Sequence, residues 1–392
     1  MAAMKRCGGA VLLLAACLGA AADPPRAWLD GFEGGFPSDI LFVKGKKVAG
    51  TTMGGVVRRV GARHGVAFFS PLMPKVAPAS WRSGGRERWV LDEFRKFAEA
   101  RPESRIGWGQ EQTLSPRRKG LNASSGPLER LAARALRVTV VREPVAHAIS
   151  SCTHFGPCGA RSKNTKAAYN ASVDARVRWV AETMTTSQML RFIAPDPDPA
   201  RLDAAAAADF YHAILLADAI DESLVALASA VPSLSLADVL YVSAKTNHND
   251  ARRPAPEKHQ DEFKRRLRIL FYGPAYADDG ALPDRGFPDG DRPATFSPDA
   301  HLYYAAKARL RATVAALGTP TFKRDLRAFK TMQQRMLKAC AKGSAHRGAY
   351  PGNLKPRDAA ACIYGDQGCG YRCLDAWVDD RDARLATRAA GD

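Results

Sequence analysis

The sequence predicts an α/β protein with a parallel sheet flanked by helices, a helical C-terminal part and a disulfide-rich tail. Of the 392 residues, 46% are hydrophobic and 25% are charged, as in a globular protein with a sizeable core. Short apolar runs alternate with helical stretches over about 200 residues, which is the pattern of strand–helix–strand units. This composition excludes a disordered chain and a polytopic membrane protein.

Five apolar runs are the expected strands, and a helical stretch follows each of them. They are Ile40–Val43, Val66–Phe69, Val138–Val141, Ile214–Leu216 and Val239–Val242. Between them lie long connections, notably Pro71–Ser125 and Gly273–Pro298, and such connections in compact domains are usually lids or binding loops. From His301 to Cys340, apolar residues recur three and four positions apart, which predicts a pair of amphipathic helices packed on the sheet.

The N-terminus has the features of a secretory signal. Lys5 and Arg6 precede an uncharged run, Cys7–Ala22, which is shorter than the roughly 20 apolar residues of a spanning helix. We expect a signal peptide or an uncleaved signal anchor over residues 1–22. The regions expected to follow are a Pro/Gly-rich stem over 23–38, a main domain over 39–340 and a Cys-rich tail over 341–392.

Two further features favour the secretory pathway and the Golgi lumen. Asn122-Ala-Ser124 and Asn170-Ala-Ser172 are acceptor tripeptides for glycosylation. An even set of cysteines follows the signal segment, and in an oxidising lumen it predicts disulfides: Cys152, Cys158, Cys340, Cys362, Cys369 and Cys373. We expect no zinc site in the tail, because the cysteine spacing is wrong and no histidine lies near enough.

The net charge is +18, from 58 lysines and arginines against 40 aspartates and glutamates. Such a chain favours phosphate, sulfate, nucleic-acid or anionic-glycan partners. The charge alone does not choose among them, and a purely solubilising role is its plain alternative.

The segment Ile40–Met53 carries the first functional motif. An apolar strand runs into a turn of glycine, lysine and threonine, and a helix follows. Strand, small-residue turn and helix N-terminus form an anion site, because unsatisfied backbone N–H groups converge there. Gly45 and Gly50 have the spacing of the nucleotide-triphosphate loop, so the sheet is expected to be P-loop-like. Thr51, however, stands where that motif has lysine, and the available lysine is Lys47.

The segment Arg137–Ser151 carries the second motif. It begins as a buried strand and continues as a helix, with Pro144 suited to the first turn. Arg142 ends the strand, where its guanidinium can meet a phosphate bidentately. Two helical turns return the hydroxyl of Ser150 to the same side, so these two side chains are expected to bind one phosphate.

Together the two motifs resemble those of sulfotransferases that use 3′-phosphoadenosine 5′-phosphosulfate (PAPS). The resemblance implies that Lys47 is the catalytic cation, and that Arg142 and Ser150 bind the 3′-phosphate. The cradle of the 5′-phosphosulfate would be Val48, Ala49, Gly50, Thr51, Thr52 and Met53.

Three later stretches, Ile220–Leu227, Leu236–Val242 and 302–340, are similar to the galactose 3-O-sulfotransferase family, of the cerebroside sulfotransferase type. This resemblance implies sulfuryl transfer to a hydroxyl of a galactose-containing glycan. It implies PAPS as co-substrate, no metal and no nucleic-acid partner. Membrane contact is expected only through the N-terminal segment, if that segment is uncleaved.

The catalytic base is the weakest part of the pattern. Related enzymes use a histidine or glutamate between the two PAPS motifs. Glu111 is the first candidate and His64 the second, although His64 also suits a helix end; His147 is expected to be structural. Two alternatives stay open. One is a secretory-pathway kinase with Asp218 and Asp221 as magnesium ligands, and the other is a non-catalytic, basic glycan-binding protein.

Overall fold

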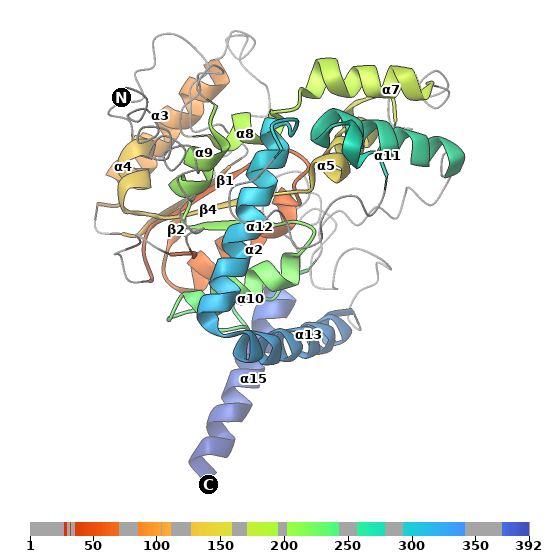
Figure 1. Ribbon diagram of the computed structural model, residues 1–392. Coiled ribbons are helices and arrows are strands. Elements are labelled where there is room, and N and C mark those ends of the chain that lie inside the picture. The colour runs from red at the N-terminus through yellow and green to blue at the C-terminus, as the bar shows by residue number, and fades with distance from the viewer. Residues whose placement is uncertain are drawn as a thin grey trace, which may run out of the picture.

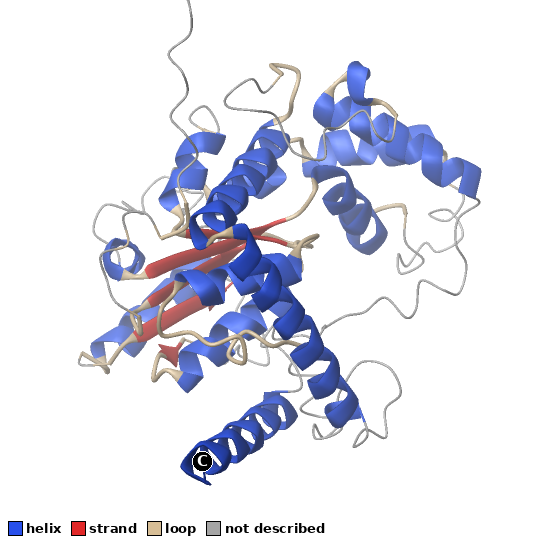
Figure 2. Ribbon diagram, turned by 60° about the horizontal axis from the view of Figure 1, so that its bottom comes forward, coloured by secondary structure: helices blue, strands red, loops and turns tan. Residues whose placement is uncertain are grey.

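The computed structural model describes residues 27–29, 32, 36–69, 85–102, 104–110, 127–158, 171–194, 202–242, 257–278, 293–341 and 371–391. At its centre is a five-stranded parallel sheet with the strand order β2-β3-β1-β4-β5 (Figure 1). The strands are β1 (Ile40–Lys44), β2 (Ala67–Phe68), β3 (Ile106–Gln110), β4 (Leu136–Val141) and β5 (Ala213–Leu216). Helices lie above and below the strands (Figure 2), so the predicted α/β architecture is confirmed.

Four of the five expected strands are present, and the fifth expectation is wrong. Val239, Leu240 and Val242 are buried, but the run is not a strand, and the backbone N–H of Tyr241 donates to the side-chain oxygen of Gln333, 3.2 Å away. A short apolar run is equally suited to a strand and to a buried coil, because both need only an apolar environment.

The one strand of this sheet that was not expected is β3, which lies inside the expected connection Pro71–Ser125. Its sequence, IGWGQ, contains two glycines, and glycine disfavours strands. The structure explains why position 107 is a glycine: an added Cβ would lie 2.7 Å from the ring of Phe68 on the neighbouring strand. The glycine thus allows a close contact that its local propensity does not indicate.

The helices mostly follow the strands, as expected for a parallel sheet. They are α2 (Gly50–Arg63), α3 (Gly85–Glu99), α4 (Pro127–Arg134), α5 (Pro144–Phe155), α7 (Val173–Trp179), α8 (Gln188–Ile193), α9 (Ala204–Phe210), α10 (Ile220–Ala230), α11 (Glu257–Tyr272), α12 (Pro298–Leu317), α13 (Thr319–Ala341) and α15 (Tyr371–Gly391). A π-helical turn, Val180–Met184, and a 3₁₀ turn, Pro274–Tyr276, complete them. The two expected helices are present as α12 and α13, which meet at Gly318, where φ is +81°. Helix α12 packs on β5 as expected, whereas α13 packs mainly against α10, α12 and α15.

The expected stem contributes to the core. Trp28 and Phe36 are buried, and the backbone N–H of Trp28 donates to the hydroxyl of Thr313 on α12, 2.7 Å away. These two residues therefore pack as part of the main domain. Residues 1–22, with the expected signal segment, and the glycosylation acceptors Asn122 and Asn170 lie outside the described residues.

Disulfides occur in both places where the cysteines gather. Cys152 pairs with Cys158, and Cys340 at the end of α13 pairs with Cys373 at the start of α15. The prediction of disulfides is confirmed for these four residues, whereas Cys362 and Cys369 lie outside the described residues. The tail also contains a long helix, α15, which the sequence analysis did not predict (Figure 1).

Helix α15 is tied to α2 as well as to α13. Arg59 of α2 is 3% exposed and donates to the carbonyl oxygens of Ala237 and Asp238, and to the carboxylate of Asp375 on α15. One buried guanidinium thus joins α15 to the helix that begins at the glycine-rich loop. Among the helices that the structure describes, none combines the length and apolar character needed to cross a membrane.

Candidate functional site

The strand order brings the two sequence motifs together. The chain leaves β1 toward β2 on one side of the sheet, and leaves β4 toward β5 on the other. Strands β1 and β4 are direct neighbours, with Lys44 in register with Val140. In open parallel sheets, ligands bind beyond the carboxyl ends of two neighbouring strands whose connections diverge in this way. The loop after β1 and the residues after β4 lie at the position where this rule places a ligand.

The loop between β1 and α2 has an unusual backbone. Lys47 and Ala49 have positive φ angles of 62° and 60°, which L-residues rarely adopt. Gly50 begins α2 directly above Lys44, whose side chain is buried at 1% exposure. An added Cβ at Gly50 would lie 2.7 Å from Cδ of Lys44, so glycine allows the helix to start against this lysine.

The N-terminus of α2 has no cap from a side chain. Ala49 occupies the cap position, and the first turn contains no acidic residue. The first N–H groups of a helix have no acceptor within the helix, and they form its positive end. Thr52 and Met53 are buried within this turn, and of Thr51 only the backbone is described. The arrangement suits an anion in front of the helix.

Arg142 connects the two motifs directly. Its Nη1 donates to the backbone oxygen of Lys47 across 3.2 Å. Burial lowers the pKa of Arg142, while the negative charges of Asp218 and Glu143 raise it. Because an arginine remains protonated in proteins, this side chain adds a fixed positive charge beside the loop.

His147 supports the loop from α5. The ring is 1% exposed, and its Nε2 lies 2.8 Å from the backbone oxygen of Lys46. A carbonyl oxygen only accepts, so Nε2 carries the hydrogen. Burial, and then the charges of Arg142 and Lys47, lower the pKa of His147 to about 4, so the ring is neutral at pH 7. The expected structural role fits this geometry, and the shift has burial as its main cause, with smaller contributions from the positive charges of Arg142 and Lys47.

Two buried tyrosines hold the carboxylates near Arg142. Glu143 accepts from the N–H groups of Val145 and Ala146, which caps α5, and also from the hydroxyl of Tyr272. Asp218, two residues after β5, accepts from the hydroxyl of Tyr303 at 2.6 Å. Burial and the adjacent carboxylates raise the pKa of both tyrosines, so these hydroxyls remain donors.

Sequence reasoning missed these tyrosine–carboxylate pairs. The position of Asp218 just after a buried strand is a usable signal, because that is the ligand edge of a parallel sheet. Tyr272 and Tyr303 give no such signal, since they come from helices far along the chain.

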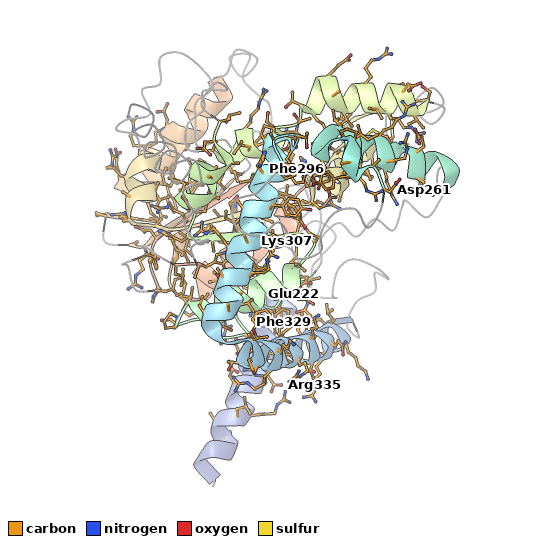
Figure 3. The ribbon with its side chains drawn as sticks, in the orientation of Figure 1. Glu222, Asp261, Phe296, Lys307, Phe329 and Arg335 are labelled. Carbon is orange, nitrogen blue, oxygen red and sulfur yellow. A yellow bond between two sulfur atoms is a disulfide. The ribbon has the colours of Figure 1, made fainter. Side chains whose placement is uncertain are left out.

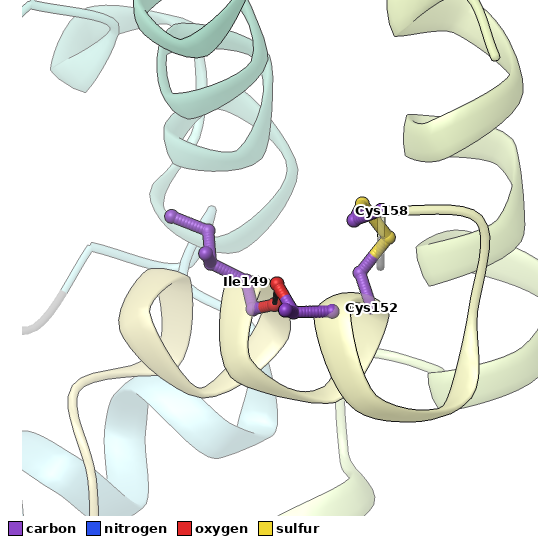
Figure 4. The surroundings of a disulfide bond; sticks show 4 residues. Ile149, Cys152 and Cys158 are labelled. Carbon is purple, nitrogen blue, oxygen red and sulfur yellow. Dashed lines mark hydrogen bonds between the residues drawn. A yellow bond between two sulfur atoms is a disulfide. The ribbon is translucent and has the colours of Figure 1, made fainter. Parts of the chain in front are cut away.

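The far end of α5 is fixed by the Cys152–Cys158 disulfide (Figure 4). There the hydroxyl of Thr153 donates to the backbone oxygen of Ile149, 2.8 Å away, and the disulfide closes the turn that follows the helix. Phe155 is 54% exposed, and Nζ of Lys46 lies 5.6 Å from the centroid of its ring. This contact places an exposed aromatic ring beside the loop.

The structure groups most of the predicted site residues. Arg142 contacts the loop, and the loop and first turn of α2 contain Lys47, Val48, Ala49, Gly50, Thr51, Thr52 and Met53. Ser150 lies on α5, two turns after its start, and is partly exposed. Glu111 lies outside the described residues.

His64 lies away from this group, and its role as the second candidate base stays a prediction. It follows the last residue of α2, whose 14 residues correspond to about 21 Å from Gly50. The ring packs edge-on against Phe36, and Nε2 is 3.5 Å from the carboxylate of Asp238. This is the helix-end position that the sequence also suggested.

The suggested magnesium ligands are both engaged by tyrosines. Asp221 accepts from the hydroxyl of Tyr241 at 2.9 Å, as Asp218 does from Tyr303. Within the described ranges, no three histidine, cysteine, aspartate or glutamate side chains are grouped so that they could hold a metal ion. Comparisons with known proteins give no match, either to a family model, to a curated protein or to a solved structure.

Proposed function

We propose that the chain is a sulfotransferase that moves the sulfuryl group of PAPS to a hydroxyl of a galactose-containing glycan. The observation that supports this most is the contact between Arg142 and the backbone of Lys47, because it joins the two motifs on which the resemblance rests. The proposal includes a P-loop-like identity for the sheet, with Lys47 in place of the usual later lysine.

The charges of the site suit a nucleotide with several anionic groups. Lys44, Lys47 and Arg142 contribute three cations, and the uncapped start of α2 adds its positive end. Lys47 and Ala49 have positive φ angles, and residues in this left-handed conformation also occur in backbone concavities that bind anions. In the proposal the 5′-phosphosulfate lies on this loop, and the 3′-phosphate lies between Arg142 and Ser150.

The reaction is an in-line displacement at sulfur. The acceptor oxygen forms a bond to sulfur while the bond from sulfur to the bridging phosphate oxygen breaks, and a base takes the hydroxyl proton. Lys47 neutralises the negative charge that accumulates on the departing oxygen, which is where a preorganised cation accelerates most. Glu111 is the proposed base, and the product nucleotide is 3′-phosphoadenosine 5′-phosphate (PAP).

The secretory pathway, with the Golgi lumen as the compartment, is part of the same proposal. The two disulfides support it, because such bonds persist in oxidising compartments. The N-terminal segment would act as a signal peptide or as a membrane anchor.

Calorimetric titration separates the proposal from its alternatives. PAP binding without added metal supports the sulfotransferase, and its loss in Arg142→Ala places the nucleotide at this site. Binding of ATP only with magnesium would instead indicate a kinase, and binding of neither nucleotide would indicate a non-catalytic glycan-binding protein. A transfer screen with labelled PAPS over galactosides, sulfated polysaccharides and glycolipids then identifies the acceptor.

A further inference from the structure

A second charged feature lies away from the loop, between α13 and α15. It is a groove of about 760 Å³. Its lining residues are Arg327, Ala328, Thr331, Met332, Arg335, Trp377, Arg381, Arg384 and Leu385. Figure 3 shows Arg335 on α13, beside the point where α15 passes. Four of the nine residues are arginines and none is acidic, so the groove has a strong positive character.

The arginines of the α13 wall are the most available. Arg327 and Arg335 are exposed, and within the described part of the chain neither has a carboxylate within 4 Å. They are eight residues apart, which corresponds to about 12 Å along the helix. These two guanidinium groups therefore offer two separate anion contacts on the same wall of the groove.

The α15 wall contributes two arginines that are partly neutralised. Arg381 contacts Asp382 at 2.9 Å and Arg384 contacts Asp380 at 2.6 Å, both on their own helix. The Arg384–Asp380 pair is exposed, and exposed pairs contribute little to stability, so an incoming anion competes with it readily. Nε of Arg381 is buried without a hydrogen-bond partner among the described residues, and Nη1 lies 2.8 Å from the sulfur of Met332.

Apolar surface lies between the charged groups. Trp377 and Met332 are half-buried, and Leu385 is 52% exposed. An indole ring offers a flat face on which the apolar face of a sugar ring packs. The groove thus combines separated cations with a stacking surface.

The two walls are fixed relative to each other. The Cys340–Cys373 disulfide joins the end of α13 to the start of α15, and Asp375 binds the buried Arg59 of α2. A preformed groove loses little conformational entropy when a ligand binds. This rigidity favours a specific site over a diffuse basic surface.

We propose that this groove binds a segment of a linear acidic polysaccharide, with its sulfate or carboxylate groups on the arginines and a sugar ring on Trp377. Opposed walls fit a narrow chain better than a flat bilayer, which would require the cations on one convex face. Single-stranded nucleic acid is less well matched, because its sites usually stack successive bases on several aromatic rings, and Trp377 is the one aromatic side chain among the described residues that line the groove. The proposal does not depend on the sulfotransferase activity.

The test is calorimetric titration of the full chain with a size-defined heparin oligosaccharide. Arg327→Gln with Arg335→Gln should weaken binding about tenfold or more, since two charge-assisted contacts are lost. The slope of log affinity against log salt should fall by about two, because each arginine releases about one counterion. Trp377→Leu should weaken binding of the oligosaccharide while leaving the salt slope unchanged.

The matched control is Lys323→Gln with Lys338→Gln, which removes the same charge from exposed positions of α13 outside the groove. This control should bind like the wild type. An equal loss in both double variants would show that only the overall charge matters and would overturn the proposal. The proposal would also be overturned if the double variant of Arg327 and Arg335 bound the oligosaccharide as tightly as the wild type. It would be overturned as well if the protein did not bind the oligosaccharide but bound phosphatidylserine vesicles or RNA through the groove. PAP binding, measured in the same variants, reports separately on the nucleotide site.

Discussion

At the residue scale, the backbone conformation of the loop determines where Lys47 lies. Its left-handed conformation and the contact from Arg142 fix the start of α2 and the lysine together. In the proposed reaction, Lys47→Ala should lower turnover about 10² to 10³-fold while changing PAP affinity far less, because the lysine charge would act mainly on the departing oxygen. Steady-state kinetics and calorimetry measure the two effects. Lys46→Ala, in the same loop, is the matched control, and a Lys47 variant within about threefold of wild type would remove this residue from the mechanism.

Arg142 and Ser150 should determine nucleotide choice. A charge-assisted hydrogen bond contributes roughly 1.5 to 3 kcal/mol, so Arg142→Ala should raise the PAP dissociation constant about ten- to a hundredfold, and Ser150→Ala should raise it less. Adenosine 5′-phosphosulfate lacks the 3′-phosphate, so its binding should hardly change. Equal losses for both nucleotides would show that the 3′-phosphate lies elsewhere.

The base is tested by a carboxylate-to-amide change. Glu111→Gln should keep PAP affinity and lower turnover about 10² to 10⁴-fold, the usual contribution of a positioned acid or base. His64→Ala should be mild, with a cost of at most about 1 kcal/mol in the free energy of unfolding, since the ring lies at the end of α2. If the acidic limb of the pH–rate profile survives Glu111→Gln but disappears in His64→Ala, the assignment is reversed.

At the scale of elements, the disulfides stabilise two different helix ends. The Cys340–Cys373 bond spans 33 residues and the Cys152–Cys158 bond spans 6. In the chain-entropy view, the longer loop contributes about 3 to 4 kcal/mol and the shorter about 2. Replacing both cysteines of a pair by serine should therefore lower the free energy of unfolding more for the first pair. Urea unfolding of the two double variants gives the order, and the reverse order would contradict this explanation.

At the scale of the whole molecule, buried histidines make stability depend on pH. Burial, and then nearby positive charges, lower the pKa of His147 and of His212 to about 4 from 6.5. Between these values the unfolded chain binds protons that the native protein does not. Each histidine therefore stabilises the fold above pH 6.5, and this contribution, roughly 3 kcal/mol at most, is lost as the pH falls toward 4.

Asp299 acts in the opposite direction. Burial raises its pKa to about 7 from 3.8, although N–H groups of Met189 and Leu190 donate to it, so its contribution to stability is lost as the pH rises toward 7.

His147→Gln, which keeps a donor for the backbone oxygen of Lys46, should flatten the decline in the free energy of unfolding between pH 6.5 and 4. Asp299→Asn should steepen it. Urea unfolding at several pH values measures both changes, and unchanged slopes would show that neither group carries the effect.

Local sequence patterns predicted the structure correctly where the residues of a single strand, helix or loop determine it. Apolar runs predicted four strands, the spacing of apolar residues predicted α12 and α13, and the motifs named a loop whose parts meet in the structure. They failed at β3, where Gly107 is explained by the ring of Phe68 on another strand. They failed also at Val239–Val242, where burial occurs without strand pairing.

The sequence by itself determined the parallel α/β class, the disulfide-forming cysteines at both places and the residues of the loop. Only the tertiary structure decided that Arg142 donates to Lys47, that His64 lies at the far end of α2, and that Tyr303 binds Asp218. Only it formed the arginine groove between α13 and α15. The physical reason is that strand propensity, helical periodicity and turn chemistry act over a few residues. Contacts between distant segments depend on strand order and side-chain packing, which no short stretch of sequence encodes.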